Sequence, residues 1–279
     1  MNYRHVYHAG NFADVLKHLV LALVVTHLKT KDKPFLVLDA HAGVGLYDLT
    51  SVPAGKTGEW RGGIGRLWTD PGLPACAQPY LDAIHALNPD GVLRYYPGSP
   101  VVAAELLRAD DRLVLNEKHP QDFQTLSLRF RRDGRATVLN GDAYGTAKAA
   151  VPPPERRGLV LFDPPYEEKD EFARLTKGLK QALSRWPTGS YMVWYPIKAR
   201  SQVDRVLADV VNLGPPPTLA VELMIHTDDD PNRLNGSGVL VINPPWTLEA
   251  DLSVLLPVLT ERLTDGGGGY SLRWLVPEE

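Results

Sequence analysis

The sequence predicts a doubly wound α/β fold built on one mostly parallel sheet of seven strands. Seven short apolar runs are separated in most cases by stretches with helical periodicity, and this alternation is typical of parallel strands joined by crossover helices. Several runs are apolar throughout, as strands buried on both faces are. Three runs end in an acidic residue, at the position where α/β sheets place their ligands.

Composition indicates a globular protein, which we expect to be a single domain over residues 1–279 with 44% hydrophobic residues. The net charge of -3 and pI near 6.2 exclude a protein that binds nucleic acid through a general positive charge, so any polyanion contact requires a local basic face. The single cysteine, Cys76, excludes an internal disulfide and fits a reducing cytosol. The most apolar segment, residues 19–25, is too short to span a bilayer, and no signal-peptide cleavage site follows it. We therefore expect a cytoplasmic protein without membrane contact.

The first segment, residues 3–18, is crowded with histidines, aromatic residues and cations. It leads into a helix predicted from Asn11 to Lys29, with Asn11 as the N-cap. We interpret the segment as a lip of a cofactor or substrate site, with a solvated arm as the alternative. No metal site is predicted, because three histidines lack the spacing of a zinc motif and have no cysteine nearby: His5, His8 and His18.

The first predicted strand, from Phe35, runs into Asp39 and a turn containing Gly43 and Gly45. Strand, acid, glycine-rich turn and a following helix are typical of a cofactor-binding turn at the switch point of an α/β sheet. The turn lacks the third glycine of G-x-G-x-x-G and the G-K-[ST] of a P-loop, which disfavours dinucleotides and nucleoside triphosphates. Residues 48–99 are too long for an ordinary connection, so we expect an inserted, mostly helical subdomain with helical pieces at residues 63–68 and 79–87.

The second predicted strand ends at Glu117, where an acid in a nucleotide-binding sheet accepts hydrogen bonds from ribose hydroxyls; a surface carboxylate is the alternative. A helix precedes it, from Ser99 to about Arg108. The helix that follows carries an arginine cluster that is either a solvated face or the best basic patch of the chain: Arg129, Arg131, Arg132 and Arg135. Further strands are predicted at residues 136–140, 159–162, 191–196, 219–225 and 238–243, with helices at 172–186 and 201–211.

The strand at residues 158–162 ends in Asp163-Pro164-Pro165-Tyr166. The prolines stop the strand ladder and hold the carbonyl groups of Asp163 and Pro164 without backbone donors. A carboxylate, fixed carbonyls and the aromatic ring of Tyr166 together suit a flat heterocycle that carries an exocyclic amino group. We therefore predict that amino-group chemistry occurs at this loop.

A second tetrapeptide, Asn243-Pro244-Pro245-Trp246, copies this pattern after another apolar run. The last strand of such a sheet normally runs antiparallel, which places Asn243 at the end away from the cofactor. Asp163 instead ends the fourth strand, beside the first, and faces the turn at Gly43. We predict that Asp163 is the reacting carboxylate and that Asn243 begins a rigid turn that buries Trp246.

With these residues in view, the chain resembles the RlmJ family of bacterial 23S ribosomal RNA adenine-N6 methyltransferases. The resemblance is carried by residues 3–18, 39–45, 98–100, 163–166 and 236–246, and it covers essentially the whole chain. It implies a Rossmann-like class I methyltransferase fold, S-adenosyl-L-methionine as cofactor and 23S ribosomal RNA as partner, with no obligate protein partner and a monomeric state.

The resemblance also implies a role for individual residues. His18, His41, Gly43 and Ser99 would line the cofactor pocket. Glu117 would hold the ribose hydroxyls, and Asp142 with Ala143 would frame the cofactor adenine. Asp163 would be catalytic, beside Pro164 and Tyr166, and Tyr3 would touch the RNA, with the helical subdomain assisting.

Three other functions remain open on the residues alone. A DNA adenine-N6 methyltransferase would use the same site, because only contacts to the 2′-hydroxyl and to RNA shape distinguish the substrates. An NAD-dependent oxidoreductase fits the strand, turn and acid, but not the missing glycine or the Asp163 loop. A non-catalytic RNA-binding protein is disfavoured by the intact Asp163 and Gly43.

Overall fold

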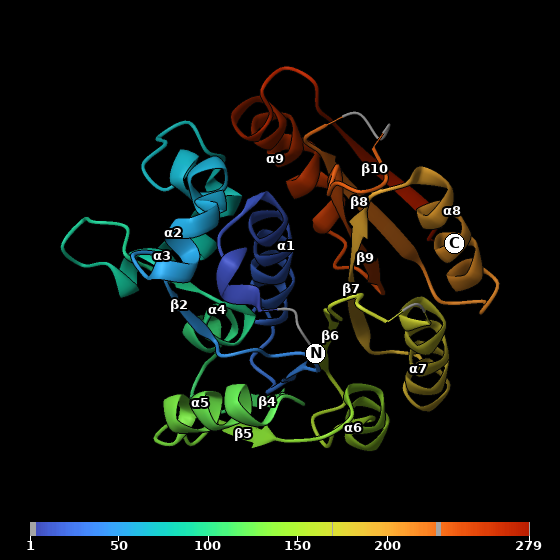
Figure 1. The fold of residues 1–279 in the computed structure, drawn as a ribbon. Helices are drawn as coiled ribbons and strands as arrows, with labels where there is room; N and C mark the ends of the chain where they lie inside the picture. The colour runs from blue at the N-terminus through green and yellow to red at the C-terminus, as the bar shows by residue number, and fades with distance from the viewer. Residues whose placement is uncertain (1–3, 169, 227–229, 279) are drawn as a thin grey trace.

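The computed structural model describes residues 4–168, 170–226 and 230–278, and its centre is one eight-stranded sheet (Figure 1). The strands lie in the order β10-β8-β9-β7-β6-β1-β4-β5. Their bounds are β1 Leu36–Asp39, β4 Arg112–Asn116, β5 Ala136–Leu139, β6 Gly158–Phe162, β7 Ser190–Ile197, β8 Thr218–Met224, β9 Gly236–Ile242 and β10 Gly269–Val276. All seven predicted strands are therefore confirmed within about two residues of their expected bounds.

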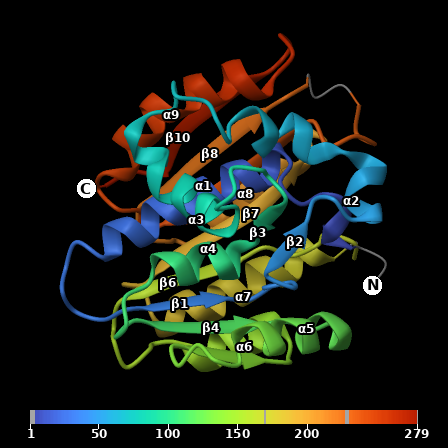
Figure 2. The same cartoon turned by 90° about the vertical axis from the view of Figure 1, so that its left-hand side faces the viewer.

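The strands β5, β4, β1, β6 and β7 are parallel, whereas β9 runs antiparallel to both β7 and β8. We call the end of the sheet where the five parallel strands finish the carboxyl end, and the end where they start the amino end. In Figure 2 the strands β1 and β4 run across the view, and the loop from α1 into β1 lies at the amino end. The strand β9 therefore finishes at the amino end, as the sequence predicts for Asn243.

Helices cover both faces of the sheet, which confirms the doubly wound class. One face carries α1 Phe12–Leu28, α4 Ser99–Leu106, α5 Pro120–Phe130 and α9 Leu248–Leu263, and the other carries α6 Ala143–Ala150, α7 Glu171–Arg185 and α8 Arg200–Val211. The strand β6 serves both cores, because its side chains alternate: Leu161 packs on the side of α1, and Phe162 on the side of α6 and α7. None of the helices in the described ranges is long and apolar enough to cross a membrane.

The helix α1 begins where the sequence predicts. The side chain of Asn11 accepts hydrogen bonds from the backbone N–H groups of Ala13 and Asp14, and so caps the first turn. The rest of the helix is apolar and buried almost to its end, with the exception of three polar side chains that are buried with it: Asp14, Lys17 and His18. Buried charges need partners, so this helix carries part of a polar site into the core.

The prediction of a helix directly after the glycine turn was wrong. The chain instead forms the strand β2, Leu46–Asp48, which pairs antiparallel with β3, Tyr95–Pro97. The backbone N–H of Gly98 donates to the carbonyl of Gly45 at 2.8 Å and closes this ladder. Residues 49–94 lie between the two strands and contain α2 Val52–Thr57, three 3-10 turns and α3 Gln78–Leu87, so α4 serves as the crossover helix only after this segment.

The strand β10 was not predicted, and the sheet has eight strands where seven were expected. This strand lies at the border of the sheet and pairs only with β8. Most of its side chains are half-buried, so its apolar pattern is weak, and it follows the glycine run 266–269. A half-exposed border strand after a flexible glycine segment lacks the continuous apolar signal of the central strands.

Candidate active site

Four acidic residues lie where neighbouring parallel strands end. Asp39 ends β1, Glu117 follows β4, Asp142 caps the helix after β5, and Asp163 follows β6. Because β5, β4, β1 and β6 are adjacent in the sheet, all four carboxyl groups belong to its carboxyl end. This is the ligand-binding end of an open α/β sheet.

Asp163 forms an ion pair with Lys17 of α1. The Nζ atom of Lys17 lies 2.5 Å from Oδ2 of Asp163 and 2.9 Å from Oδ1 of Asp14. Burial alone would lower the pKa of the Lys17 ammonium, but the two carboxylates outweigh it and raise that pKa. The ammonium is therefore charged at neutral pH and serves as the counter-ion of Asp163.

Asp14 connects this pair to the N-terminal segment. Its Oδ2 accepts a hydrogen bond from the backbone N–H of Gly10 at 2.9 Å and lies 2.8 Å from Nε2 of His5. Burial raises the pKa of the Asp14 carboxyl, but the charges of His5 and Lys17 overcome it and hold that pKa well below its usual range. A continuous polar network therefore runs from His5 through Asp14 and Lys17 to Asp163.

His41 holds the backbone of the same loop. The N–H of Asp163 donates to Nδ1 of His41 at 3.2 Å, and the imidazole ring packs edge-on against Tyr144 and Phe162. Burial lowers the pKa of His41 to about 4, so the ring is neutral. With Nδ1 accepting, the ring proton resides on Nε2.

The Asp163-Pro164-Pro165-Tyr166 loop contains two oxygen acceptors that have no hydrogen-bond donor within the described ranges. No residue in the described ranges donates a hydrogen bond to Oδ1 of Asp163 or to the Pro164 carbonyl. Tyr166 has a left-handed backbone with φ of 54°, and its hydroxyl donates to the Trp194 carbonyl at 2.5 Å. Its ring packs against Phe172 and Trp194, with centroids 4.5 and 5.6 Å away, so the ring is fixed in orientation and half-buried.

Asp39 and Ser99 form a buried pair beside this loop. The hydroxyl of Ser99 donates to Oδ2 of Asp39 at 2.6 Å, and the N–H of His41 donates to Oδ1 at 3.1 Å. Burial raises the pKa of Asp39 to about 7, against the lowering effect of these two hydrogen bonds. The pair joins the end of β1 to the start of α4.

Glu117 is tied to the glycine turn. Its carboxylate accepts from the N–H of Gly43 at 2.9 Å and from the N–H of His119 at 2.7 Å. Burial raises the pKa of Glu117 despite these two donors. Gly43 has a positive φ of 61°, and a Cβ at this position would meet the Tyr47 hydroxyl at 2.8 Å, so the turn requires glycine.

The remaining predicted cofactor residues lie on either side of this centre. Asp142 caps α6 by accepting from the N–H of Gly145, and Ala143 is the first residue of that helix. His18 is 1% exposed, and its Nδ1 lies 2.8 Å from the Tyr96 hydroxyl, so this ring is buried in the core next to Tyr96. Burial lowers the pKa of His18 to about 3, and the ring is neutral. Tyr3, predicted to touch RNA, lies outside the described residues.

The second tetrapeptide lies at the opposite end of the sheet, as predicted. The side-chain amide of Asn243 donates to the carbonyls of Pro187 and Gly189, and the residue has a positive φ of 50°. The prediction that this turn buries Trp246 was wrong, because that side chain is 78% exposed. The hydrogen bonds of Asn243 hold the turn by themselves, so the indole is not needed in the core.

Lys17 and Asp14 were not predicted as site residues. The available signal was a pair of charged residues, three positions apart, inside a helix that is otherwise apolar. Such charges are buried only when they are paired or functional. Within the described part of the chain, no three histidine, cysteine, aspartate or glutamate side chains converge as a metal-binding group.

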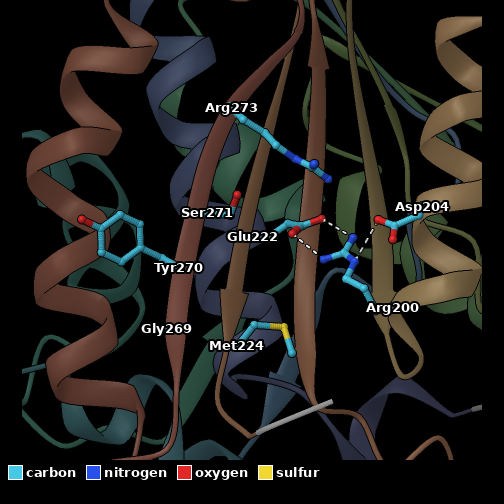
Figure 3. Close-up of a pocket in the computed structure, with 8 residues that line it drawn as sticks. All are labelled: Arg200, Asp204, Glu222, Met224, Gly269, Tyr270, Ser271 and Arg273. Atoms are coloured by element: carbon cyan, nitrogen blue, oxygen red, sulfur yellow. Dashed lines mark hydrogen bonds and ion pairs between the residues drawn. The ribbon is translucent and has the colours of Figure 1, made fainter. Parts of the chain in front are cut away.

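An open hollow elsewhere on the surface does not coincide with this site. It lies between α8, β8 and β10, where Arg200 forms two hydrogen bonds of 2.7 and 2.9 Å with Glu222 (Figure 3). The Tyr195 hydroxyl also donates to Glu222. Because the buried carboxylate of Glu222 is already satisfied by these donors, it is not a free acceptor of the kind that the Asp163 loop provides.

Comparison with known proteins identifies close relatives over the whole chain. A family model described as "Ribosomal RNA large subunit methyltransferase D, RlmJ" matches residues 32–276. The ribosomal RNA large subunit methyltransferases J of Escherichia coli and Haemophilus influenzae are each 45% identical to the chain, with full coverage of both sequences. A crystal structure of a Legionella pneumophila protein superposes with a TM-score of 0.89 at 34% identity, covering 95% of this chain and 98% of that one.

Proposed function

The chain belongs to the RlmJ family of ribosomal RNA large subunit methyltransferases, and from this premise we propose that it methylates the N6 amino group of an adenine in 23S ribosomal RNA. The methyl donor is S-adenosylmethionine. The observation that carries the proposal is the Asp163-Pro164 pair at the carboxyl end of β6, where two oxygen acceptors without donors suit the two N–H bonds of an amino group.

The residues around the glycine turn fit S-adenosylmethionine. Glu117 offers carboxylate lone pairs for ribose hydroxyls beside a turn that has no Cβ at Gly43. Asp142 and Ala143 lie at the start of α6, after β5, which is the neighbour of β4 in the sheet. They would frame the cofactor adenine. His41 and Ser99 would line the pocket on the side of β1, and His18 would support it from the core, where it pairs with the Tyr96 hydroxyl.

When bound, the cofactor supplies an electrophilic sulfonium methyl group. The enzyme must make a poor nucleophile reactive, because the lone pair of an adenine amino group is delocalised into the ring. Asp163 and the Pro164 carbonyl each accept a hydrogen bond from one N–H group of the amino nitrogen. These two hydrogen bonds draw the nitrogen toward tetrahedral geometry and aim its lone pair at the methyl group. Lys17 fixes the position of the carboxylate by donating to Oδ2, which leaves Oδ1 for the substrate. Asp163 or water takes the proton as the product forms.

The substrate adenine stacks on Tyr166, whose ring is fixed by the hydrogen bond of its hydroxyl to Trp194. A base must leave its neighbours to reach this position, which costs a few kcal/mol and favours single-stranded or unfolded RNA. We further propose that Tyr3 and the inserted subdomain at residues 48–99 contact the RNA around the target. The enzyme acts as a monomer in the cytoplasm.

Family membership disfavours the two alternative activities. The relatives are ribosomal RNA methyltransferases, and neither a DNA methyltransferase nor an NAD-dependent oxidoreductase is among the family descriptions. The deciding experiment incubates the purified protein with total RNA and cofactor labelled in its methyl group, and then maps the label. We expect one labelled adenine in 23S ribosomal RNA. Label in DNA alone, or binding of NADH without binding of S-adenosylmethionine, would overturn the proposal.

A further inference from the structure

We infer that the amino end of the sheet carries a second RNA-binding surface, which holds ribosomal RNA away from the target adenine. This inference rests on the proposed function for the identity of the partner. The surface, here called the basic rim, consists of five exposed cations and one exposed tryptophan: Lys31, Lys33, Arg131, Arg132, Arg156 and Trp246.

The order of the strands places these residues along one line. Arg131 and Arg132 precede β5, Lys31 and Lys33 precede β1, Arg156 precedes β6, and Trp246 follows β9. All of these positions belong to the amino end, because β9 is antiparallel to the others. Five strand spacings separate β5 from β9 in the sheet. At about 4.8 Å for each spacing, the rim extends roughly 24 Å.

The rim is positively charged in a protein whose net charge is -3. None of its five cations forms an ion pair with another residue in the described ranges. Three acids of the same loops are already neutralised: Asp111 by Arg108, Glu155 by Arg112 and Asp133 by Arg135. In the loops before β5, β4, β1 and β6, and in the last turn of α4, this leaves Asp32, Asp110 and Glu105 as carboxylates without an ion pair in the described ranges, against the five cations. A polyanion is the partner that this charge complements.

The lysines are presented by a fixed loop. The guanidinium of Arg108 donates to the carbonyls of Lys31 and Lys33, at 2.9 and 3.1 Å. On the other side, Arg157 donates to the carbonyl of Leu28 at 2.8 Å. The loop joins α1 to β1 and lies at the opposite side of the sheet from β2 (Figure 2). A braced backbone reduces the entropy lost when a phosphate binds its side chains.

Trp246 ends the rim with an aromatic face. Its turn is fixed by the two hydrogen bonds of Asn243, and its indole meets the edge of the His27 ring, with centroids 6.3 Å apart. Burial and the charges of Lys31 and Arg157 lower the pKa of His27, against the effect of Asp251. Cations therefore lie close to a solvent-exposed indole, and this combination binds an unpaired base together with its phosphate.

The test compares two triple variants that remove the same kinds of side chain. The rim variant is Lys31→Ala, Lys33→Ala, Trp246→Ala; none of these side chains belongs to the reaction site. The control variant removes two exposed lysines of α7 and the exposed tyrosine of β10: Lys177→Ala, Lys180→Ala, Tyr270→Ala. Each protein is assayed with a long fragment of large-subunit ribosomal RNA and with an oligonucleotide around the target. The oligonucleotide is too short to reach from the carboxyl end of the sheet to the amino end. The five residues of β6 span this distance, about 17 Å.

For the rim variant, we expect the dissociation constant of the long fragment to rise about tenfold or more, through the loss of one stacked base and two phosphate contacts. The slope of log K against log salt should fall by about 1.5. Methylation of the short oligonucleotide and the thermal midpoint should not change, and the control variant should resemble wild type. Equal affinity and slope in the rim variant, or an equal loss in the control, would overturn the inference. Binding is measured without cofactor, so an enzyme that binds the long RNA but methylates none refutes the proposed function separately.

Discussion

Lys17 and Asp163 are 146 residues apart in sequence, and their side chains meet at 2.5 Å in the interior of the site. The contact joins the first helix to the loop after β6. It also places Asp14, and through it His5, in the same network as the carboxylate that we propose contacts the substrate. Substitutions in α1 should therefore change catalysis, although this helix ends at the opposite side of the sheet.

The first prediction concerns Asp163→Ala. Removing the carboxylate takes away one of the two acceptors for the amino group, so methyl transfer should fall by a factor of about 100 or more. The affinity for S-adenosylmethionine should change little, and folding should survive because Lys17 keeps Asp14 as a partner. Single-turnover methylation and calorimetric titration with the cofactor measure the two effects. A variant that turns over like wild type would remove Asp163 from the mechanism.

The second prediction compares Lys17→Met with Lys17→Arg. Methionine leaves the buried carboxylate of Asp14 and the carboxylate of Asp163 without their shared cation, which should destabilise the fold by about 3–5 kcal/mol. The Lys17 charge is one of the causes that hold the pKa of Asp14 low, so the stability difference between wild type and Lys17→Met should shrink as the pH falls. The methylation rate of folded enzyme should also fall, because Oδ2 of Asp163 loses its donor.

Lys17→Arg is the control, because it keeps the charge but changes the geometry of the donors. It should recover most of the stability and only part of the rate. Urea unfolding at several pH values and single-turnover rates provide the measurements. If the stability difference between wild type and Lys17→Met stays constant as the pH falls, the ammonium does not hold down the pKa of Asp14.

The central fold was predictable because its signals are local and continuous. The runs that form β1, β4 and β6 have continuous apolar centres, and the acids and glycines that follow them mark the carboxyl end of the sheet. The location of Asp163 and Asn243 at opposite ends of the sheet was predictable from strand direction alone. By contrast, β10 lacks a continuous apolar run, and the pairing of β2 with β3 depends on contacts across some fifty residues.

The network behind Asp163 was not predictable from the sequence motif. The motif identifies the carboxylate, but its counter-ion comes from α1, and only tertiary packing determines which buried charges meet. The exposure of Trp246 was not predictable either. The sequence does not show that the hydrogen bonds of Asn243 hold the turn and leave the indole in solvent. The positions of the acids at the strand ends are therefore predictable from sequence, whereas the partners of buried charges require the structure.

The third prediction uses the pH dependence of stability. His41 has a pKa of about 4 in the fold, below its ordinary value near 6.5, so the unfolded chain binds more protons between these two values. The stability due to neutral His41 is complete above pH 6.5 and is lost as the pH falls toward 4. Comparison with His41→Gln isolates this contribution, because His18 and Asp39 titrate in both proteins.

The free energy of unfolding of wild type relative to His41→Gln should decrease by about 1.4 kcal/mol for each pH unit between 6.5 and 4. Urea unfolding of both proteins at pH 7, 6 and 5 measures the difference. A constant difference across this range would show that His41 is not held neutral by burial.

The last prediction separates the two tetrapeptides. Asn243→Ala loses two hydrogen bonds to the carbonyls of Pro187 and Gly189, and it leaves a Cβ at a positive φ, so it should destabilise the protein by about 2–4 kcal/mol. Asn243→Gly relieves the backbone strain without restoring the hydrogen bonds, and should recover part of this loss. Because Asn243 lies at the amino end of the sheet, the single-turnover rate of folded enzyme should equal that of wild type in both variants. A loss of rate without a loss of stability would instead place the reaction at Asn243, and would require an acceptor pair at that end of the sheet that the hydrogen bonds of its amide do not provide.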